Sequence, residues 1–183
     1  MLTDLQDIIG RIKKGDHAAF RKIVEEYRQQ AFSVAFRITC DEEEARDAVQ
    51  ESFIKIWEKL EQYDMNRNFS TWMLRIVVNS AIDRKRQMDR HHLIRLDQSL
   101  KKFEIPDPDF FEREADNKEM ASLITWLAQG LPEKQQMVFI LRDIQGLESD
   151  EVEQILNMSE TKVKSNLYQA RKTIRERFEK TFK

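Results

Sequence analysis

Apolar residues recur at intervals of three and four through most of the chain, which is the period of helices that bury one face. In the first half this pattern predicts a helix over residues 5–12, a longer helix over residues 20–38, and a third helix that begins at Asp41. Asp41 has a glutamate three residues further on, which is the spacing of a capping box. After a loop over residues 63–69, Ser70 is predicted to cap a fourth helix, which becomes basic toward its end.

The helical pattern stops at about residue 96 and resumes near residue 112. Pro106 and Pro108 stand in this gap among acidic residues, and proline together with like charges favours an extended chain. The chain has only 4 glycines and 3 prolines in total, which argues against a turn-rich β architecture. The sequence therefore predicts an all-α chain of two small helical domains, residues 1–95 and 112–183, joined by an acidic linker, residues 96–111.

The second domain carries the pattern of a helix-turn-helix. Gly130 and Pro132 mark the boundary between two helices, because glycine suits a helix end and proline suits a first turn. Gly146 ends the second of these helices; a short helix follows over residues 149–156, then a tight turn at Asn157, which tolerates the left-handed conformation. The long basic helix after the turn can present donors to the major groove of DNA. An ordinary helical bundle with a solvated basic face is the alternative.

Charge and composition narrow the class of protein. The formal net charge is −2, from 31 basic and 33 acidic residues, so only the distribution of charge can indicate a nucleic-acid partner. Cys40 is the only cysteine, which rules out an intramolecular disulfide. No apolar run approaches the ~20 residues that span a bilayer, and the N-terminus lacks the apolar stretch of a signal peptide. We therefore expect a cytoplasmic protein without membrane insertion.

Catalytic and metal-binding patterns are missing from the sequence. His91 and His92 are adjacent and so point apart on a helix, and His17 is the only other histidine. No HExxH, P-loop or nucleophile-elbow pattern occurs. We expect that the protein is not an enzyme and uses no cofactor and no metal.

Three stretches resemble segments of bacterial RNA polymerase sigma factors. Residues 68–83, NFSTWMLRIVVNSAID, are similar to the sigma segment that opens the −10 promoter element. Residues 47–57, DAVQESFIKIW, resemble the helix that docks on the coiled coil of the largest polymerase subunit, and residues 131–177 resemble the domain that reads the −35 element. The stretches stand in the family's order, without an intermediate domain, which is typical of the extracytoplasmic-function (ECF) type.

The resemblance implies a factor that binds core RNA polymerase and directs promoter recognition, melting and transcription initiation for a specialised, stress or envelope-signal, regulon. Melting requires a flipped base, which costs on the order of a few kcal/mol, and a loop at a helix N-terminus can hold such a base. Arg84, in the basic end of the helix, is expected to hold phosphates. Phe69 as a hydrophobic staple and Asn79 as a core amide are the alternatives at those positions. The expected contacts to melted −10 DNA are Arg67, Asn68, Phe69, Ser70, Thr71, Arg75, Asn79, Lys85 and Arg86.

The two other expected interfaces differ in charge. An acidic helix face repels phosphates and suits a basic protein partner, and an ordinary solvated face is the alternative. The expected polymerase contacts are Asp47, Gln50, Glu51, Phe53 and Trp57, of which the two aromatic residues are also candidates for the core. The expected contacts to double-stranded −35 DNA are Arg142, Lys162, Lys164, Ser165, Asn166, Tyr168, Gln169 and Arg171.

The resemblance implies two further features of such a factor. One is an anti-sigma factor that holds it inactive. The other is a linker that threads toward the polymerase active site, where its acidic residues mimic nucleic acid; a plain hinge is the alternative. A repressor or activator that uses the same helix-turn-helix without polymerase is the alternative function, and it leaves residues 69–83 unexplained.

Overall fold

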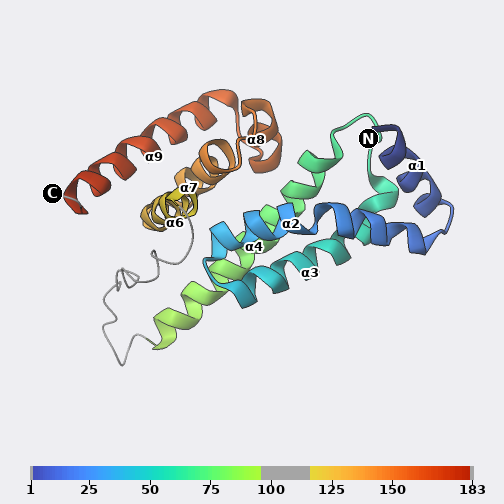
Figure 1. Cartoon of the computed structure of the whole chain (residues 1–183), viewed down its shortest axis with the longest axis horizontal. Helices are drawn as coiled ribbons and strands as arrows, with labels where there is room; N and C mark the ends of the chain where they lie inside the picture. The colour runs from blue at the N-terminus through green and yellow to red at the C-terminus, as the bar shows by residue number, and fades with distance from the viewer. Residues whose placement is uncertain (1, 96–115, 182–183) are drawn as a thin grey trace. The chain divides into compact units, whose positions relative to one another are not determined.

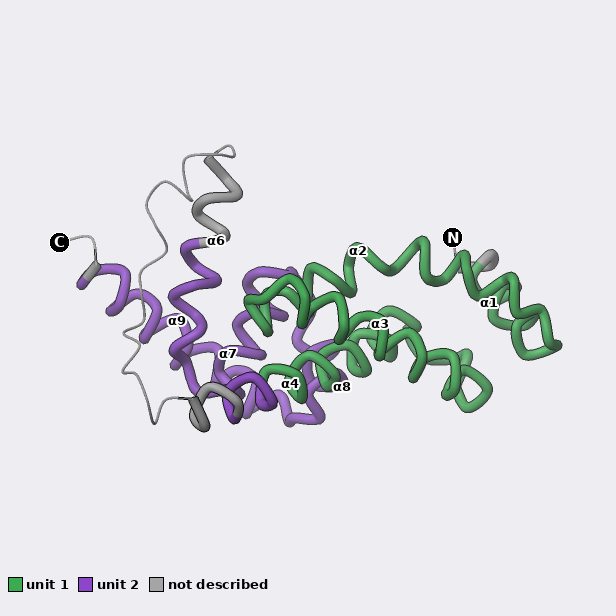
Figure 2. Tube along the Cα trace, turned by 90° about the horizontal axis from the view of Figure 1, so that it is seen from below, with its two compact units in different colours: residues 1–85 green, residues 86–183 purple. Residues whose placement is uncertain are grey.

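The computed structural model of the chain describes residues 2–95 and 116–181 (Figure 1). Every regular element within these ranges is a helix, which confirms the all-α prediction. The helices gather in two compact units, residues 1–85 and 86–183 (Figure 2). The predicted acidic linker, residues 96–111, lies outside the described residues, so the domain bounds drawn from the sequence stay a prediction.

The first unit is held together by the apolar faces of its helices. It contains α1 (Leu2–Lys13), η1 (His17–Ala19), α2 (Phe20–Thr39), α3 (Glu42–Lys59), η2 (Leu60–Gln62) and most of α4 (Phe69–Arg95). Fully burying one large aliphatic side chain contributes about 1.5–3 kcal/mol, so the shared core fixes the packing of these short helices. The most deeply buried large side chains of this unit are Ile9, Ile23, Ile38, Ile56, Leu60, Met73 and Leu74.

The junction between α2 and α3 follows from two local features. Cys40 ends α2 in the left-handed conformation, with φ 55°, which turns the chain sharply. Asp41 then caps α3, because its carboxylate accepts a hydrogen bond from the Glu44 backbone N–H at 3.0 Å. The predicted cap of the third helix is therefore confirmed.

The start of α4 differs from the prediction. Ser70 does not cap the helix; its hydroxyl donates to the side-chain oxygen of Gln30 at 3.3 Å. The Asn68 side chain instead accepts from the Thr71 backbone N–H at 3.1 Å. The helix begins at Phe69, and this residue is buried, so the core sets the start of the helix and Asn68 is the residue left to cap it.

The second unit contains the helix-turn-helix. Its complete helices are α6 (Asp116–Gln129), α7 (Glu133–Phe139), the π-helix η3 (Ile140–Ile144), α8 (Ser149–Leu156) and α9 (Glu160–Thr181). α8 has the predicted bounds, and Asn157 after it is left-handed at φ 51°. Ala128, Leu131, Phe139 and Ala170 form a buried cluster that joins α6, α7 and α9.

Gly130 has a different role from the one the sequence indicated. Helix α6 does end before it, but its φ is not among the positive values found at Gly15 and Gly146. The space above Gly130 is filled by the guanidinium of Arg177, whose Cζ would lie 2.9 Å from an added Cβ. Arg177 donates to the carbonyls of Leu127 at 2.9 Å and Gly130 at 2.7 Å. The absence of a Cβ at Gly130 leaves room for this guanidinium, which supplies a cation to the helix end.

Candidate nucleic-acid and protein interfaces

The loop that precedes α4 is ordered by its own polar groups. The Asp64 side chain accepts from the backbone N–H and the side-chain amide of Asn66, both at 3.0 Å, and the Arg67 N–H donates to the Asp64 carbonyl at 3.0 Å. The two bonds from Asn66 lower the pKa of Asp64, the backbone bond most of all. Arg67 and Asn68 are exposed at the end of the loop. The result is a short, fixed turn that presents polar groups beside a helix N-terminus.

An aromatic cluster lies beneath this loop. The Phe69 ring lies 5.2 Å from Tyr27, 5.3 Å from Tyr63 and 5.6 Å from Trp72, measured between ring centroids. Phe69 is only 3% exposed, and Thr71 is 4% exposed. Because Phe69 is the first residue of the helix, after the Asn68 cap, it does not occupy the position of a hydrophobic staple. Of the predicted −10 set, these two side chains support the loop from inside, and Ser70 is half-buried beside them.

The outer face of α4 carries polar side chains in line. Arg75, Asn79 and Arg86 are exposed, at spacings of four and seven residues that bring them to one side of the helix, and Lys85 is half-buried. The exposure of Asn79 excludes the alternative of a core amide. Arg75 and Asn79 suit a sugar-phosphate backbone and a base edge, whereas the Arg86 guanidinium donates to the Glu133 carboxylate at 2.9 and 2.8 Å.

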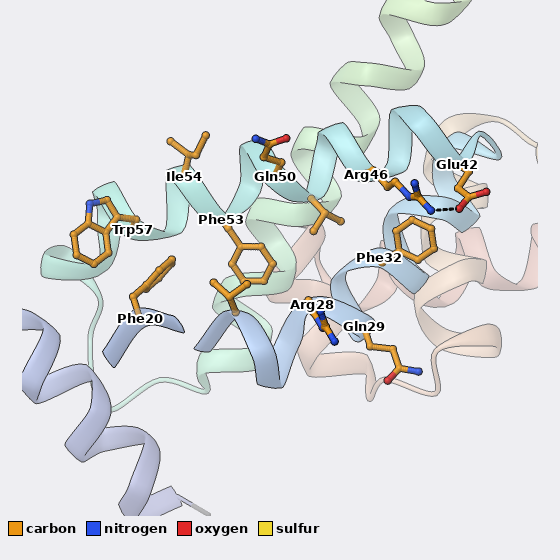
Figure 3. Close-up of a pocket in the computed structure, with 12 residues that line it drawn as sticks. Phe20, Arg28, Gln29, Phe32, Glu42, Arg46, Gln50, Phe53, Ile54 and Trp57 are labelled. Carbon is orange, nitrogen blue, oxygen red and sulfur yellow. Dashed lines mark hydrogen bonds and ion pairs between the residues drawn. The ribbon is translucent and has the colours of Figure 1, made fainter. Parts of the chain in front are cut away.

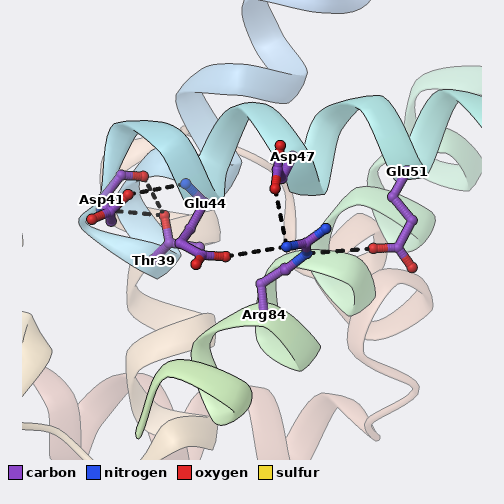
Figure 4. A network of polar contacts seen from close by, with 6 residues as sticks. All are labelled: Thr39, Asp41, Glu44, Asp47, Glu51 and Arg84. Carbon is purple, nitrogen blue, oxygen red and sulfur yellow. Dashed lines mark hydrogen bonds and ion pairs between the residues drawn. The ribbon is translucent and has the colours of Figure 1, made fainter. Parts of the chain in front are cut away.

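Arg84 does not lie with these cations. Its guanidinium faces α3, where it approaches the carboxylates of Asp47 at 3.1 Å, Glu44 at 3.4 Å and Glu51 at 3.6 Å (Figure 4). The expectation that Arg84 holds phosphates is therefore corrected: in this structure three carboxylates surround it. Glu51 also pairs with Lys55 at 2.7 Å, and this hydrogen bond, followed by the charges of Lys55 and Arg84, lowers the pKa of Glu51.

The predicted polymerase contacts lie along one broad face of α3. At 3.6 residues per turn, Asp47 and Glu51 fall on the edge toward α4, and Phe53 and Trp57 fall on the edge toward α2. Gln50 lies between them and is exposed. The aromatic edge forms one wall of an open groove whose other wall is α2, with Phe53 buried and Trp57 half-buried (Figure 3).

Sequence reasoning missed one member of this face. Ile54 is 53% exposed, lines the groove, and points outward from α3 beside Gln50 (Figure 3). The signal was available, because Ile54 is a large apolar residue that stands off the buried stripe of its helix. An exposed aliphatic side chain next to an apolar groove is typical of a protein-binding surface. A solvated acidic face alone does not account for it.

The recognition helix α9 presents most of its predicted side chains to solvent. Lys162, Lys164, Ser165, Gln169 and Arg171 are exposed, and the Tyr168 side chain is 67% exposed. Some of them are also held within the protein, which fixes their direction. Lys164 pairs with Glu160 at 2.5 Å, and this bond raises the pKa of Lys164 and lowers that of Glu160.

Three polar members of the −35 set make further contacts. Arg171 donates through two nitrogens to Asp143, at 2.8 and 2.6 Å, and this hydrogen bonding raises the pKa of Arg171. The half-buried Asn166 donates to the Lys162 carbonyl at 2.7 Å. Arg142 donates to the Leu147 carbonyl, so it braces the turn before α8. Asp143 was not recognised in the sequence, since nothing local indicates a partner 28 residues away.

Other kinds of site were sought in the same residues. Residues 2–95 and 116–181 contain no group of histidine, cysteine and acidic side chains arranged to bind a metal ion. Among the helices of this described part, none combines the length and the apolar character that a bilayer crossing needs.

Comparison with known proteins places both units in one family. Residues 23–91 match the family "Sigma-70 region 2", and residues 126–174 match the family "Sigma-70, region 4". The chain is 30% identical over 173 residues to the ECF RNA polymerase sigma factor SigW of Bacillus subtilis, covering 91% of this chain and 92% of the relative. It is 28% identical to the RNA polymerase sigma-H factor of Pseudomonas aeruginosa, covering 95% and 94%.

Solved structures share the fold. CnrH, in complex with the cytosolic domain of CnrY, superposes with a TM-score of 0.67 at 20% identity, over 94% of this chain and 95% of that one. The sigma factor RpoE of Bartonella quintana, in complex with the anti-sigma factor NepR, gives a TM-score of 0.67 at 18% identity, over 86% and 94%.

Proposed function

The chain belongs to the ECF family of RNA polymerase sigma factors, and from this membership we propose how its residues divide the work of promoter recognition. As a sigma factor it binds core RNA polymerase and directs promoter recognition, melting and initiation for a specialised regulon. The observation that carries this function is the presence of a region 2 and a region 4 match in one chain, in the family's order.

The surface that reads melted −10 DNA is proposed to be the loop before α4 together with the outer face of that helix. Its contacts are the exposed Arg67, Asn68, Arg75, Asn79 and Arg86, helped by the half-buried Ser70 and Lys85. Backbone N–H groups at a helix N-terminus attract phosphate, and cations along the helix follow the strand. Phe69 and Thr71 belong to this surface as buried supports.

The polymerase-binding surface is proposed to be the broad face of α3. Ile54, Phe53 and Trp57 supply apolar contact, and Gln50 supplies a hydrogen-bonding group. Asp47 and Glu51 supply negative charge that attracts a basic partner and speeds association. The positive charge of Arg84 partly neutralises these carboxylates, and its ion pairs hold them in place.

The −35 surface is proposed to be the exposed side of α9, with the helix in the major groove. Lys162, Lys164 and Arg171 suit phosphates or guanine edges, while Ser165, Asn166 and Gln169 suit base edges. Tyr168 offers an exposed ring that can contact a thymine methyl group. Arg142 contributes as the brace of the turn before α8.

Three further proposals follow from the family. The protein acts as an initiation factor without catalysis or a cofactor of its own. It works in the cytoplasm, where its polymerase is. An anti-sigma factor holds it inactive, by analogy with the complex of RpoE and NepR.

A binding and transcription assay tests the function. The purified protein is mixed with core RNA polymerase, and co-elution is followed by start-specific transcription from a genomic promoter library. Stable co-elution with selective initiation is expected. Tight duplex binding without any response to core polymerase would instead establish the polymerase-independent regulator.

Two variants test the polymerase-binding surface and the −10 surface separately. Ile54→Glu should weaken co-elution by about tenfold or more, because it places a charge in an apolar contact. Lys59→Glu, which puts the same residue at an exposed position on the opposite side of α3, is the control and should co-elute normally. Asn79→Ala should keep co-elution and slow initiation. Equal binding by Ile54→Glu and the control would show that this face does not dock on polymerase.

A further inference from the structure

The loop before α4 is anchored by a residue that neither the sequence pattern nor the proposed DNA contacts include. Tyr63 is 5% exposed, and its ring lies 4.9 Å from Trp72 and 5.3 Å from Phe69. Its hydroxyl donates to the carbonyl of Arg67 at 2.5 Å, across the whole length of the turn. The chain thus leaves the core at Tyr63 and is tied back to the same residue four positions later.

A second tie comes from the N-terminal helix. The Lys13 ammonium, at the end of α1, donates to the Tyr63 carbonyl at 3.1 Å. Helix α1 lies outside the residues that match the region 2 family, which begin at residue 23, so its contribution is not described by that match. The backbone of Tyr63 is therefore fixed from one side by α1 and its ring from the other by the aromatic cluster.

We propose that Tyr63 is the positioning residue of the −10 loop: its buried ring fixes the start of the turn and its hydroxyl fixes the Arg67 carbonyl, so that residues 64–68 meet the melted strand in one conformation. This inference rests on the proposed function of the loop. A turn that is already ordered loses little conformational entropy on binding, and entropy loss otherwise weakens the complex. Burial also raises the pKa of Tyr63, so the hydroxyl stays protonated and able to donate at neutral pH.

The chain offers a matched pair of substitutions. Tyr63→Phe keeps the ring and removes the hydroxyl that holds Arg67. Tyr27→Phe also keeps a ring of the same cluster, which lies 5.2 Å from Phe69, but the Tyr27 hydroxyl makes no hydrogen bond among the described residues. The two variants differ in the bond to the loop and share the loss of one oxygen atom.

The first measurement uses the complete protein bound to core polymerase and a fluorescent single-stranded −10 oligonucleotide from a promoter that the wild-type holoenzyme transcribes. Tyr63→Phe should weaken oligonucleotide binding about three- to tenfold, the effect of one lost hydrogen bond, while Tyr27→Phe stays close to wild type. Affinity for core polymerase should be equal in all three proteins, because neither Tyr63 nor Tyr27 is among the residues that line the groove between α2 and α3.

The second measurement is independent of DNA. Amide hydrogen exchange of residues 64–68 in the free protein should accelerate in Tyr63→Phe and in Lys13→Met, and remain unchanged in Tyr27→Phe. If exchange and oligonucleotide binding are alike in Tyr63→Phe and Tyr27→Phe, the positioning role is wrong. If exchange accelerates as expected but the wild-type holoenzyme does not select the −10 strand, the inferred anchor is correct and the proposed function of the loop is wrong.

Discussion

Single side chains decide where the helices of this protein begin and end, and two of them did so against expectation. Ser70 and Asn68 are both good capping residues, and propensity alone does not choose between them. The choice is made by Phe69, which enters the aromatic cluster only if the helix starts at that residue. Gly130 was expected to end a helix through the backbone freedom of glycine, whereas in the structure its missing side chain leaves room for Arg177. In both cases the deciding contact reaches a residue distant in the sequence, Tyr27 for Phe69 and Arg177 for Gly130, so the sequence pattern could not reveal it.

The capping role of Asn68 gives the first prediction. Asn68→Ala should lower the free energy of unfolding by about 1 kcal/mol, because the Thr71 N–H loses its acceptor. Ser70→Ala is the control and should cost clearly less, since its hydroxyl makes only a 3.3 Å bond to another side chain. Urea denaturation followed by circular dichroism measures both. If Ser70→Ala lowered the free energy of unfolding more than Asn68→Ala does, Ser70 and not Asn68 would be the capping residue.

The contact between Gly130 and Arg177 gives the second prediction. Gly130→Ala should displace the guanidinium and cost about 1–2 kcal/mol of stability, because two helix-end carbonyls lose a charged donor. In an Arg177→Ala background the same substitution should cost much less, and a double-mutant cycle measures this coupling. Gly10→Ala is the control, since nothing lies within 4 Å of an added Cβ in the middle of α1, and it should be neutral or stabilising. Additive effects of the two substitutions would contradict the contact.

At the scale of elements, the helices could be predicted and their mutual contacts could not. The apolar period gave the all-α class, the bounds of α8 and the turn at Asn157, because these depend on residues that are close in the sequence. Arg84 was assigned to DNA because it sits in a basic run, yet its partners lie on α3, some 33 to 40 residues earlier. Asp143 was missed for the same reason, because its partner Arg171 is 28 residues away. Exposed charges look alike in a sequence until the packing of the helices gives them neighbours.

The ion pairs between α3 and α4 predict a pH dependence. The pKa of Glu51 is lowered from its usual value of 4.5, so its ionised form stabilises the folded protein above that pH, and the contribution is lost as the pH falls through the folded-state pKa. Glu51→Gln should therefore be less stable than wild type at about pH 7, and the difference should shrink as the pH falls below 4.5 and through the folded-state pKa. Glu58→Gln, at an exposed glutamate of the same helix without an ion pair among the described residues, is the control. Thermal melting over this pH range measures the difference, and a gap that does not shrink toward the acidic end would argue against the pairing.

At the scale of the whole molecule, an acidic net charge coexists with two surfaces proposed to bind DNA. The net charge of −2 conceals this division, since the basic side chains gather on α4 and α9 while the acidic ones gather on α3. The proposed −10 contacts other than Arg86 lie in the first unit, and the proposed −35 contacts lie in the second, so the two surfaces can be altered separately.

Independent surfaces give the last prediction. Asn79→Ala in the first unit and Gln169→Ala in the second should each slow initiation, and the free-energy effects of the two should add in the double variant within about 0.5 kcal/mol. Abortive-initiation rates with the holoenzyme, measured at one fixed salt concentration, give the four values of the cycle. Strong non-additivity would show that recognition of the −10 element and recognition of the −35 element are coupled inside the protein.

The π-helix at Ile140–Ile144 has a consequence for the evolution of the family. A π turn accommodates one residue more than an α turn between the same two ends. A sequence that lacks one residue here can close the turn as an ordinary α-helix and leave α7 before it, and Gly146 and α8 after it, in place. An alignment of relatives is therefore expected to show a single-residue gap at these positions, in a helix where a deletion elsewhere would rotate every later side chain by about 100°.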